Sequence, residues 1–394
     1  MRLSRAAARA VPAGLLLAAA TTWAEQEADS VAVAPPATTP AAIAPPDATP
    51  PATTPPDTSA SRSSVVPLPA LLYSPETGIG GGALVLWTFR LGDSEASRRR
   101  PSTVTPLFLI TQKRQIVARV TGDIYSRGGS WRYTGRVGGA RFPDRFWGIG
   151  NDTSDELEEE YTPVTLESSL GVQRLLPRDW FVGVETSRAR RRLQDLEEGG
   201  LIDSGEVPGA EDGRIVGLGL RLRRDTRDWS IAPTGGGTFE VAATAHPAAL
   251  GSDFEYDGWS VDLRRYVGIG RTVLAGRVLG VFTASGDPPF DLLPALGGDS
   301  LLRGYYAGRY RDRHLAAVQL EIRVPIWWRL GVIGFGSAGQ VAPEVARFAP
   351  DRFHPAAGFG VRFRPKEEDR TSLRFDWGFG ENRSGFYFGL GEAF

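Results

Sequence analysis

The sequence predicts an all-β protein: a 16-stranded antiparallel transmembrane β-barrel with one long external loop folded inward. After residue 64, segments of 10 to 13 residues alternate between two faces. They exceed the 5 or 6 residues usual in soluble strands and match the roughly 9 to 11 that cross a membrane at a tilt. A soluble β-sandwich would also alternate, but here the polar face is rich in Arg and Gly, as a watery lumen allows. Residues 214–223 show this, with Val216, Leu218, Leu220 and Leu222 on one face and Gly217, Gly219, Arg221 and Arg223 on the other.

Composition excludes several other classes of protein. The 394 residues carry 45 basic and 46 acidic side chains, so the net charge of -1 argues against a nucleic-acid binder. The absence of Cys excludes disulfides and thiolate zinc sites, and three His leave little room for a histidine-rich metal site. After the N-terminal segment, no apolar run reaches the 18 or so residues of a membrane helix.

The N-terminal residues predict export. Residues 1–24 have an early cluster of Arg, an apolar run over 11–20 and small residues up to Ala24, which is the pattern of a cleaved signal peptide. Residues 25–64 are rich in Pro, Ala and Thr, a composition that cannot bury a core, so they predict a disordered periplasmic linker. The barrel is expected over 65–394.

Sixteen segments carry the alternation. Pro67 and Pro69 make the first an edge-like strand. An even count places both barrel ends in the periplasm, and the short and long connections alternate as periplasmic turns and external loops do. Long external loops are expected at 143–162, 192–212, 286–312 and 342–353. The expected strands are 65–74, 78–90, 102–112, 115–126, 130–142, 163–175, 179–191, 213–224, 236–248, 255–268, 271–285, 313–325, 329–341, 354–365, 370–380 and 384–394.

The last segment has the features of a C-terminal assembly signal for outer-membrane barrels. Its expected outward face is Phe386, Phe388, Leu390 and Phe394, while Glu392 departs from the pattern. Such a signal implies that the barrel assembly machinery inserts this chain. This strand must pair with the Pro-containing first strand, so the seam between them is expected to be the weakest in the wall.

Three motifs go beyond a generic barrel. The first is the turn sequence 224–228 with Pro233 and Gly235, in which Asp225, Arg227 and Asp228 are the polar residues. The second is Gly298-Asp-Ser-Leu-Leu-Arg-Gly-Tyr305, and the third is Gln319-Leu-Glu-Ile-Arg-Val-Pro325. In this order they resemble the outer-membrane assembly barrels of the BamA/TamA superfamily, also called the bacterial surface antigen family. The resemblance covers roughly residues 65–394.

That resemblance implies a sixth external loop folded into the lumen, with Arg303, Gly304 and Tyr305 at its tip. It implies that Arg303 pairs with Glu321 on the next strand, and alternation independently turns Glu321 toward the lumen. Relatives place an Asp on the following strand, where this sequence has Ser337. The turn motif is expected to be structural, with short Asp side chains bonding backbone amides. The family's POTRA domains are not expected in residues 25–64.

The sequence therefore predicts an outer-membrane barrel that inserts or exports proteins, without its own substrate-collecting domains. A passive or gated pore is the alternative, and a lipid-modifying enzyme is a weaker one, since no Gly-x-Ser-x-Gly motif or catalytic set occurs. No catalytic residue, metal or cofactor is expected. The expected partners are outer-membrane lipid and the assembly machinery, with a separate periplasmic protein as a further candidate and no nucleic acid.

Overall fold

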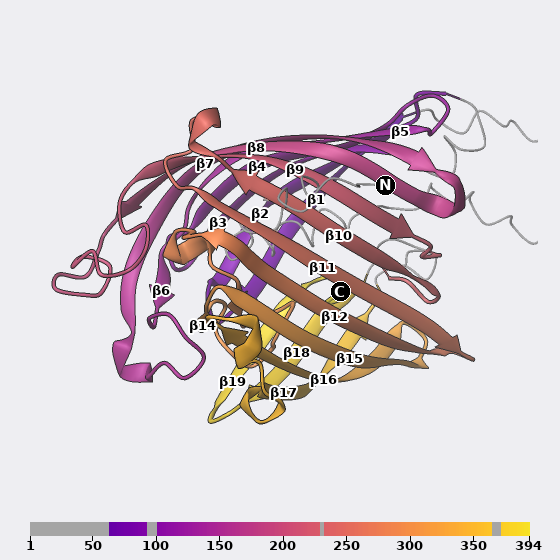
Figure 1. The fold of residues 1–394 in the computed structure, drawn as a ribbon. Helices are drawn as coiled ribbons and strands as arrows, with labels where there is room; N and C mark the ends of the chain where they lie inside the picture. Colours follow the sequence, from indigo (N-terminus) through magenta and orange to yellow (C-terminus); the bar gives the residue numbers. More distant parts are fainter. Residues whose placement is uncertain (1–62, 93–100, 229–231, 365–371) are drawn as a thin grey trace, which may run out of the picture.

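The computed structural model describes residues 63–92, 101–228, 232–364 and 372–394. Sixteen antiparallel strands form a closed wall (Figure 1). The predicted fold is confirmed, although the signal peptide and most of the linker lie outside the described residues. The wall strands are β1 Ser63–Ser74, β2 Gly78–Phe89, β3 Ser102–Thr111, β4 Ile116–Tyr125, β5 Trp131–Arg141, β7 Glu159–Leu176, β8 Trp180–Gln194, β9 Gly213–Asp225, β10 Gly236–His246, β11 Tyr256–Ile269, β12 Thr272–Gly286, β15 His314–Trp327, β16 Leu330–Ala342, β17 His354–Phe363, β18 Leu373–Gly380 and β19 Arg383–Leu390.

The two faces of the wall carry the alternation that the sequence shows. On β9, Leu218 and Leu220 are 51% and 49% exposed on the outer surface, where lipid would cover them. Arg221, which directly follows Leu220, points into the lumen, where it forms ion pairs of 2.8 Å with Glu185 and 2.5 Å with Glu240. Because successive side chains of a strand point to opposite faces, the alternating sequence gives the barrel an apolar exterior and a charged interior.

The connections differ in length at the two ends of the barrel. At one end β11 and β12, and β15 and β16, are joined by two residues each, whereas at the other end β12 and β15 are separated by residues 287–313. Three short strands lie in the long loops: β6 Asp144–Phe146 pairs with β7, and β13 Ala295–Leu296 pairs with β14 Tyr310–Arg311. The described segments also contain the 3-10 helices η1 Asp155–Leu157, η2 Pro177–Asp179, η3 Ala248–Leu250, η4 Phe290–Leu292, η5 Val345–Arg347 and η6 Pro350–Arg352. None of the helices in the described segments is long and apolar enough to span a membrane.

The wall closes where the first strand meets the last. Only Tyr73 and Phe388 are in register between β1 and β19, whereas β1 pairs with β2 along all 12 of its residues. Continuing that antiparallel register places Leu390, the last residue of β19, opposite Leu71. Residues 64–70 of β1 therefore extend past the end of β19. This half of β1 has no partner in β19, so the seam is the least paired junction of the wall.

The chain end departs from the expected outward strand. Phe386, Phe388 and Leu390 lie on the outer face of β19, but β19 ends there, and Gly391 takes a left-handed φ of +79°. Phe394 is consequently only 5% exposed and packs inside with Tyr266 and Val273. The expectation that Phe394 faces outward was wrong, because the backbone reverses at Gly391 and ends the alternation.

Candidate functional site

The long loop between β12 and β15, residues 287–313, folds into the barrel and is here called the inner loop. Its leucines pack against the inner surfaces of the wall strands, which anchors the loop by apolar burial. Leu296 and Leu302 are fully buried. The Nε2 group of Gln319 on β15 donates to the carbonyl of Ser300 at 3.0 Å. These contacts attach the loop to the wall independently of the charged contacts made by its tip.

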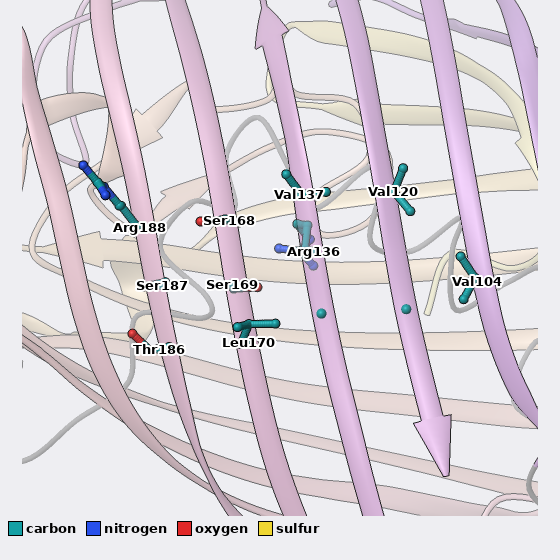
Figure 2. Close-up of a pocket in the computed structure, with 12 residues that line it drawn as sticks. Val104, Val120, Arg136, Val137, Ser168, Ser169, Leu170, Thr186, Ser187 and Arg188 are labelled. Atoms are coloured by element: carbon teal, nitrogen blue, oxygen red, sulfur yellow. The ribbon is translucent and has the colours of Figure 1, made fainter. Parts of the chain in front are cut away.

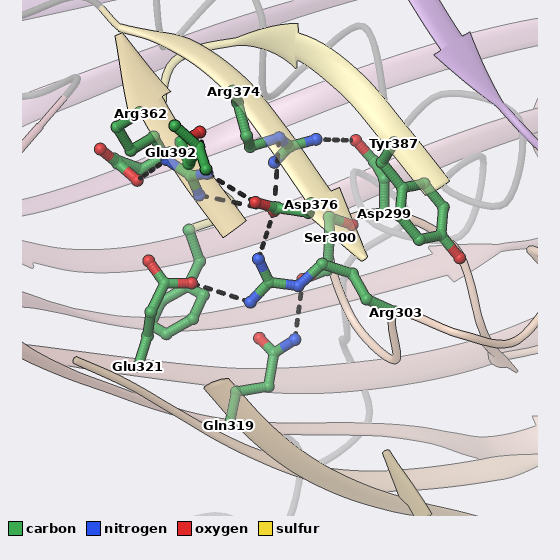
Figure 3. Close-up of polar contacts among 12 residues, drawn as sticks. Asp299, Ser300, Arg303, Gln319, Glu321, Arg362, Arg374, Asp376, Tyr387 and Glu392 are labelled. Carbon is green, nitrogen blue, oxygen red and sulfur yellow. Dashed lines mark hydrogen bonds and ion pairs between the residues drawn. The ribbon is translucent and has the colours of Figure 1, made fainter. Parts of the chain in front are cut away.

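Arg303, at the tip of the inner loop, is clamped by two carboxylates from different strands (Figure 3). Its guanidinium donates to Glu321 on β15 at 2.8 Å and to Asp376 on β18 at 2.5 Å. Both carboxylate side chains have 0% exposure, and that of Arg303 has 2%. The guanidinium also lies 3.5 Å from the ring centre of Phe335 on β16. Out of water, such charge-assisted bonds hold their geometry tightly.

Further arginines contact the same two carboxylates, and Figure 3 shows those next to Asp376. Arg323 reaches the other oxygen of Glu321 at 2.7 Å, and Arg362 reaches Asp376 at 2.5 Å. Arg362 continues to Glu392, near the chain end, at 2.8 Å. The result is one connected network that joins β15, β17, β18 and the C-terminal residues. Buried charges are tolerated when each has partners of opposite sign, and this network supplies them.

Two glycines let the backbone of the loop tip lie directly on β18. Gly304 has a φ of +117°, and a Cβ there would sit 2.7 Å from the backbone nitrogen of Gly380. A Cβ on Gly378 would in turn sit 2.5 Å from the carbonyl of Arg303. The Gly304 amide donates to the hydroxyl of Tyr387 on β19 at 3.0 Å. Because any side chain would push these backbones apart, glycine is required on both sides of the contact.

Tyr305 completes the tip. Its hydroxyl donates to the carbonyl of Pro355 at 3.0 Å and accepts the amide of Glu381 at 3.0 Å. The side chain has 0% exposure. Arg303, Gly304, Tyr305, Glu321 and Asp376 are called the loop lock below, and they attach the inner loop to β15, β17, β18 and the β18–β19 turn.

Ser337 does not take part in the loop lock. It lies on β16, and its buried hydroxyl has no hydrogen-bond partner among the described residues. The second carboxylate comes instead from Asp376, 73 residues beyond Arg303. The family pattern pointed to the wrong strand. The overlooked signal was the alternation of β18, which puts Asp376 on the same inward face as Arg374.

Comparison with known proteins decides the family. The model of the Omp85 superfamily domain matches residues 160–394, which is more than half of the chain and includes the whole loop lock. The chain belongs to the Omp85 superfamily. None of the curated protein sequences matches it.

Solved structures share the fold of this Omp85 barrel. BamA from Haemophilus ducreyi lacking POTRA domains 1–3 aligns with a TM-score of 0.57 at 12% identity, over 84% of this chain and 70% of that one. CdiB from Acinetobacter baumannii aligns with a TM-score of 0.56 at 11% identity, over 84% and 60%. CdiB from Escherichia coli gives 0.53 at 12%, over 84% and 63%. The chain thus spans less than two thirds of either CdiB structure, and at these identities the likeness concerns the fold.

The external loops of this Omp85 barrel form a cap with its own core. Phe146, Ile202 and Phe290 come from three different loops and pack together with Tyr161. Arg309 of the inner loop, itself 2% exposed, bonds to Asp155 at 2.6 Å. Asp155 also accepts two bonds of 2.7 Å from Arg383, and these guanidinium groups hold the pKa of its carboxyl below the usual value. The acidic run that begins at Asp155 therefore ties loops to β19.

A second buried carboxylate joins the inner loop to the β1–β2 turn. Glu76 accepts the amide of Ala307 at 2.8 Å and is 5% exposed. Burial raises its pKa to about 7, and the nearby Asp299 carboxylate also raises it. Because burial disfavours the charged form, the charge of Glu76 changes near neutral pH.

The turn motif lies at the opposite end of the barrel, between β9 and β10. Asp225 accepts the amide of Arg227 at 3.2 Å and its guanidinium at 2.8 Å. Asp228 accepts the amide of Thr234 at 2.9 Å and that of Gly235 at 3.1 Å, bridging across Pro233. These bonds are of the kind that fix a turn. Within the described segments, no group of three His, Asp or Glu side chains is placed to hold a metal ion.

Proposed function

We propose that this Omp85 barrel moves polypeptide segments into or across the outer membrane through the seam between β1 and β19. The observation that carries the proposal is the open edge formed by residues 64–70 of β1, which extend past β19. An unpaired strand edge is a template for pairing with an incoming strand. The same edge lies in a wall that is otherwise paired over at least seven residues at each junction.

The closed lumen supports passage through the seam rather than through the centre. The loop lock and the external cap place buried ion pairs and an apolar core across one end of the barrel, where they would obstruct passage along its axis. A barrel of sixteen strands is wide enough for an aqueous channel only if nothing plugs it. A passive or gated pore therefore remains the second candidate, and a separate periplasmic partner that delivers substrates remains a prediction.

A disulfide across the seam tests the proposal. Tyr73→Cys combined with Phe388→Cys places two thiols on directly opposed residues of an antiparallel pair, a spacing compatible with a disulfide. The natural chain contains no Cys, so no other disulfide can form. The purified barrel in liposomes is assayed for its effect on the folding rate of an unfolded reporter barrel. We expect acceleration from the reduced double variant and from each single variant, and none after oxidation.

Conductance in planar bilayers separates the two candidates. A barrel that works through its seam conducts little while the loop lock is intact, and seam oxidation leaves that conductance unchanged. A high, steady conductance together with no effect on reporter folding would support the pore and reject the proposal.

A further inference from the structure

The outer face of β8 carries an unusual row of charges. Arg188, Arg190 and Arg192 alternate with inward residues and are all exposed. Among the described residues, none of the three has an ion pair or a side-chain hydrogen bond. Inward arginines close by are neutralised, since Arg191 bonds to Asp291 at 2.7 Å and Arg221 bonds to Glu185 at 2.8 Å. The row of unpaired arginines on β8 thus contrasts with these paired arginines on the inward side.

The position of the row along β8 matches the outer boundary of the membrane. Trp180 begins β8 at the end with the short turns, where Trp131 and Trp327 also lie exposed. A tilted strand crosses a bilayer in roughly 9 to 11 residues, and Arg188 is the ninth residue counted from Trp180. Arg188 and Arg190 are thus at the level of the external headgroups. Arg192 lies one step further out, toward the long loops.

A groove on the outer wall leads to this row (Figure 2). It has a volume of about 450 Å³ and crosses β3, β4, β5, β7 and β8. Gly122 and Gly135 are opposed in register and form its floor, because neither has a side chain to fill it. Val137 and Leu170 border it and are 54% and 67% exposed. Arg188 lines the end of the groove that lies on β8.

Apolar groove and unpaired cations together match one type of molecule. The groove suits an acyl chain, and neighbouring arginines of the row, two residues apart and therefore about 7 Å from each other, suit phosphate groups. Arg188 is in register with Ser168, whose hydroxyl side chain also borders the groove. On the external side of an outer membrane, the lipid that combines acyl chains with phosphates is lipid A. We propose that β8 and this groove form a binding site for lipid A, with one acyl chain lying over Gly135 and phosphate on Arg188 and Arg190.

The charge of the site is tested by native mass spectrometry of the full chain purified in detergent and incubated with lipid A. We expect the wild type to retain lipid A and the triple variant Arg188→Gln, Arg190→Gln, Arg192→Gln to retain at least tenfold less. The matched control removes three outward arginines at the other end of the barrel and should retain lipid A like the wild type. It consists of Arg174→Gln, Arg224→Gln and Arg265→Gln.

The groove is tested without changing charge. A Cβ on Gly135 would meet nothing closer than 3.6 Å, so Gly135→Leu fits the wall and fills the groove. Gly334→Leu is its control, since a Cβ there has a similar distance of 3.5 Å to its nearest neighbour. We expect Gly135→Leu alone to lower lipid A retention, with all variants remaining folded by heat-shifted gel mobility.

Two results would overturn the assignment. Undiminished lipid A on the folded triple variant would show that the row is not a headgroup site. Equal retention of phosphatidylglycerol by the wild type would show that the site reads a single phosphate and is not specific to lipid A. Neither result depends on protein transport, so the proposed function stands or falls separately.

Discussion

The loop lock and the seam lie within one strand of each other and are built in opposite ways. Asp376 on β18 is fully buried in a network of arginines, whereas the next strand, β19, meets β1 at a single registered pair, Tyr73 with Phe388. The lock uses charges whose separation would strand buried ions, which makes it hard to open. The seam has far less of the backbone pairing that holds every other junction of the wall.

This difference teaches where the barrel can yield. Opening along the axis requires breaking the contacts of Arg303 and the cap, while opening sideways requires losing little backbone pairing. The lock also binds the strands next to the seam, since Gly304 contacts β18 and its amide donates to Tyr387 on β19. A rigid lock therefore holds β18 and β19 in place, whereas β1 meets β19 at a single registered pair.

Replacing Arg303 of the loop lock should have the largest effect on stability, and it tests whether the lock is the firm part of the barrel. Arg303→Ala removes two buried ion pairs and leaves Glu321 and Asp376 with excess negative charge. We expect a loss of about 3 to 5 kcal/mol in unfolding free energy, measured by urea titration in detergent, and a rise in bilayer conductance. Arg214→Ala is the control, because its pair with Asp253 is exposed to water, which screens the attraction, so its loss should change stability far less. Equal effects of the two changes would mean that the lock is no stronger than a surface pair.

The pH response of Glu76 tests whether the cap is as firm as the lock. Its pKa in the folded chain is about 7, above the ordinary 4.5, so its stabilising contribution is full below about pH 4.5 and is lost as pH rises through 7. The loss is at most ~3 kcal/mol. Hydrogen exchange of the Ala307 amide, corrected for intrinsic rates, should quicken between pH 5 and pH 8. Glu76→Gln should remove this dependence, and a variant that kept it would assign the change to another group.

A glycine substitution measures how closely the lock approaches the wall. Gly304→Ala adds a Cβ that would sit 2.7 Å from the backbone of β18, at a φ of +117°. We expect a cost of about 2 to 3 kcal/mol from strain and displacement together, measured by the same urea titration. Gly205→Ala, at a φ of +74° with nothing within 4 Å, carries the conformational strain alone and should cost about 1 kcal/mol. If the two variants were equally stable, the close approach of loop and wall would not matter.

The sequence predicted the wall better than the site because alternation is local and the loop lock is not. Period-two patterning identified all sixteen wall strands, but β13 and β14 have two residues each, too few to show a period. Glu321 was found through its family motif and its inward face. Asp376 was missed because its partner Arg303 is distant in sequence and only the closed barrel brings β18 to the loop. Phe394 was misplaced because one left-handed residue, Gly391, reverses the pattern.

The smallest expected effect on stability comes from a substitution at the seam, and it tests whether the seam is the weak part of the wall. Tyr73→Leu keeps an apolar residue on β1 but removes the ring contact with Phe386, whose centroid lies 5.6 Å away. Such a pair is worth about 0.5 to 1.5 kcal/mol, and the seam has few other contacts to lose. We therefore expect nearly unchanged global stability, with faster hydrogen exchange confined to β1 and β19. Phe359→Leu on β17 removes an aromatic contact of similar length, 5.7 Å from Trp377, at a junction with seven registered pairs, and should leave exchange there unchanged. Faster exchange in both places would mean that the weaker backbone pairing does not set the seam apart from the rest of the barrel.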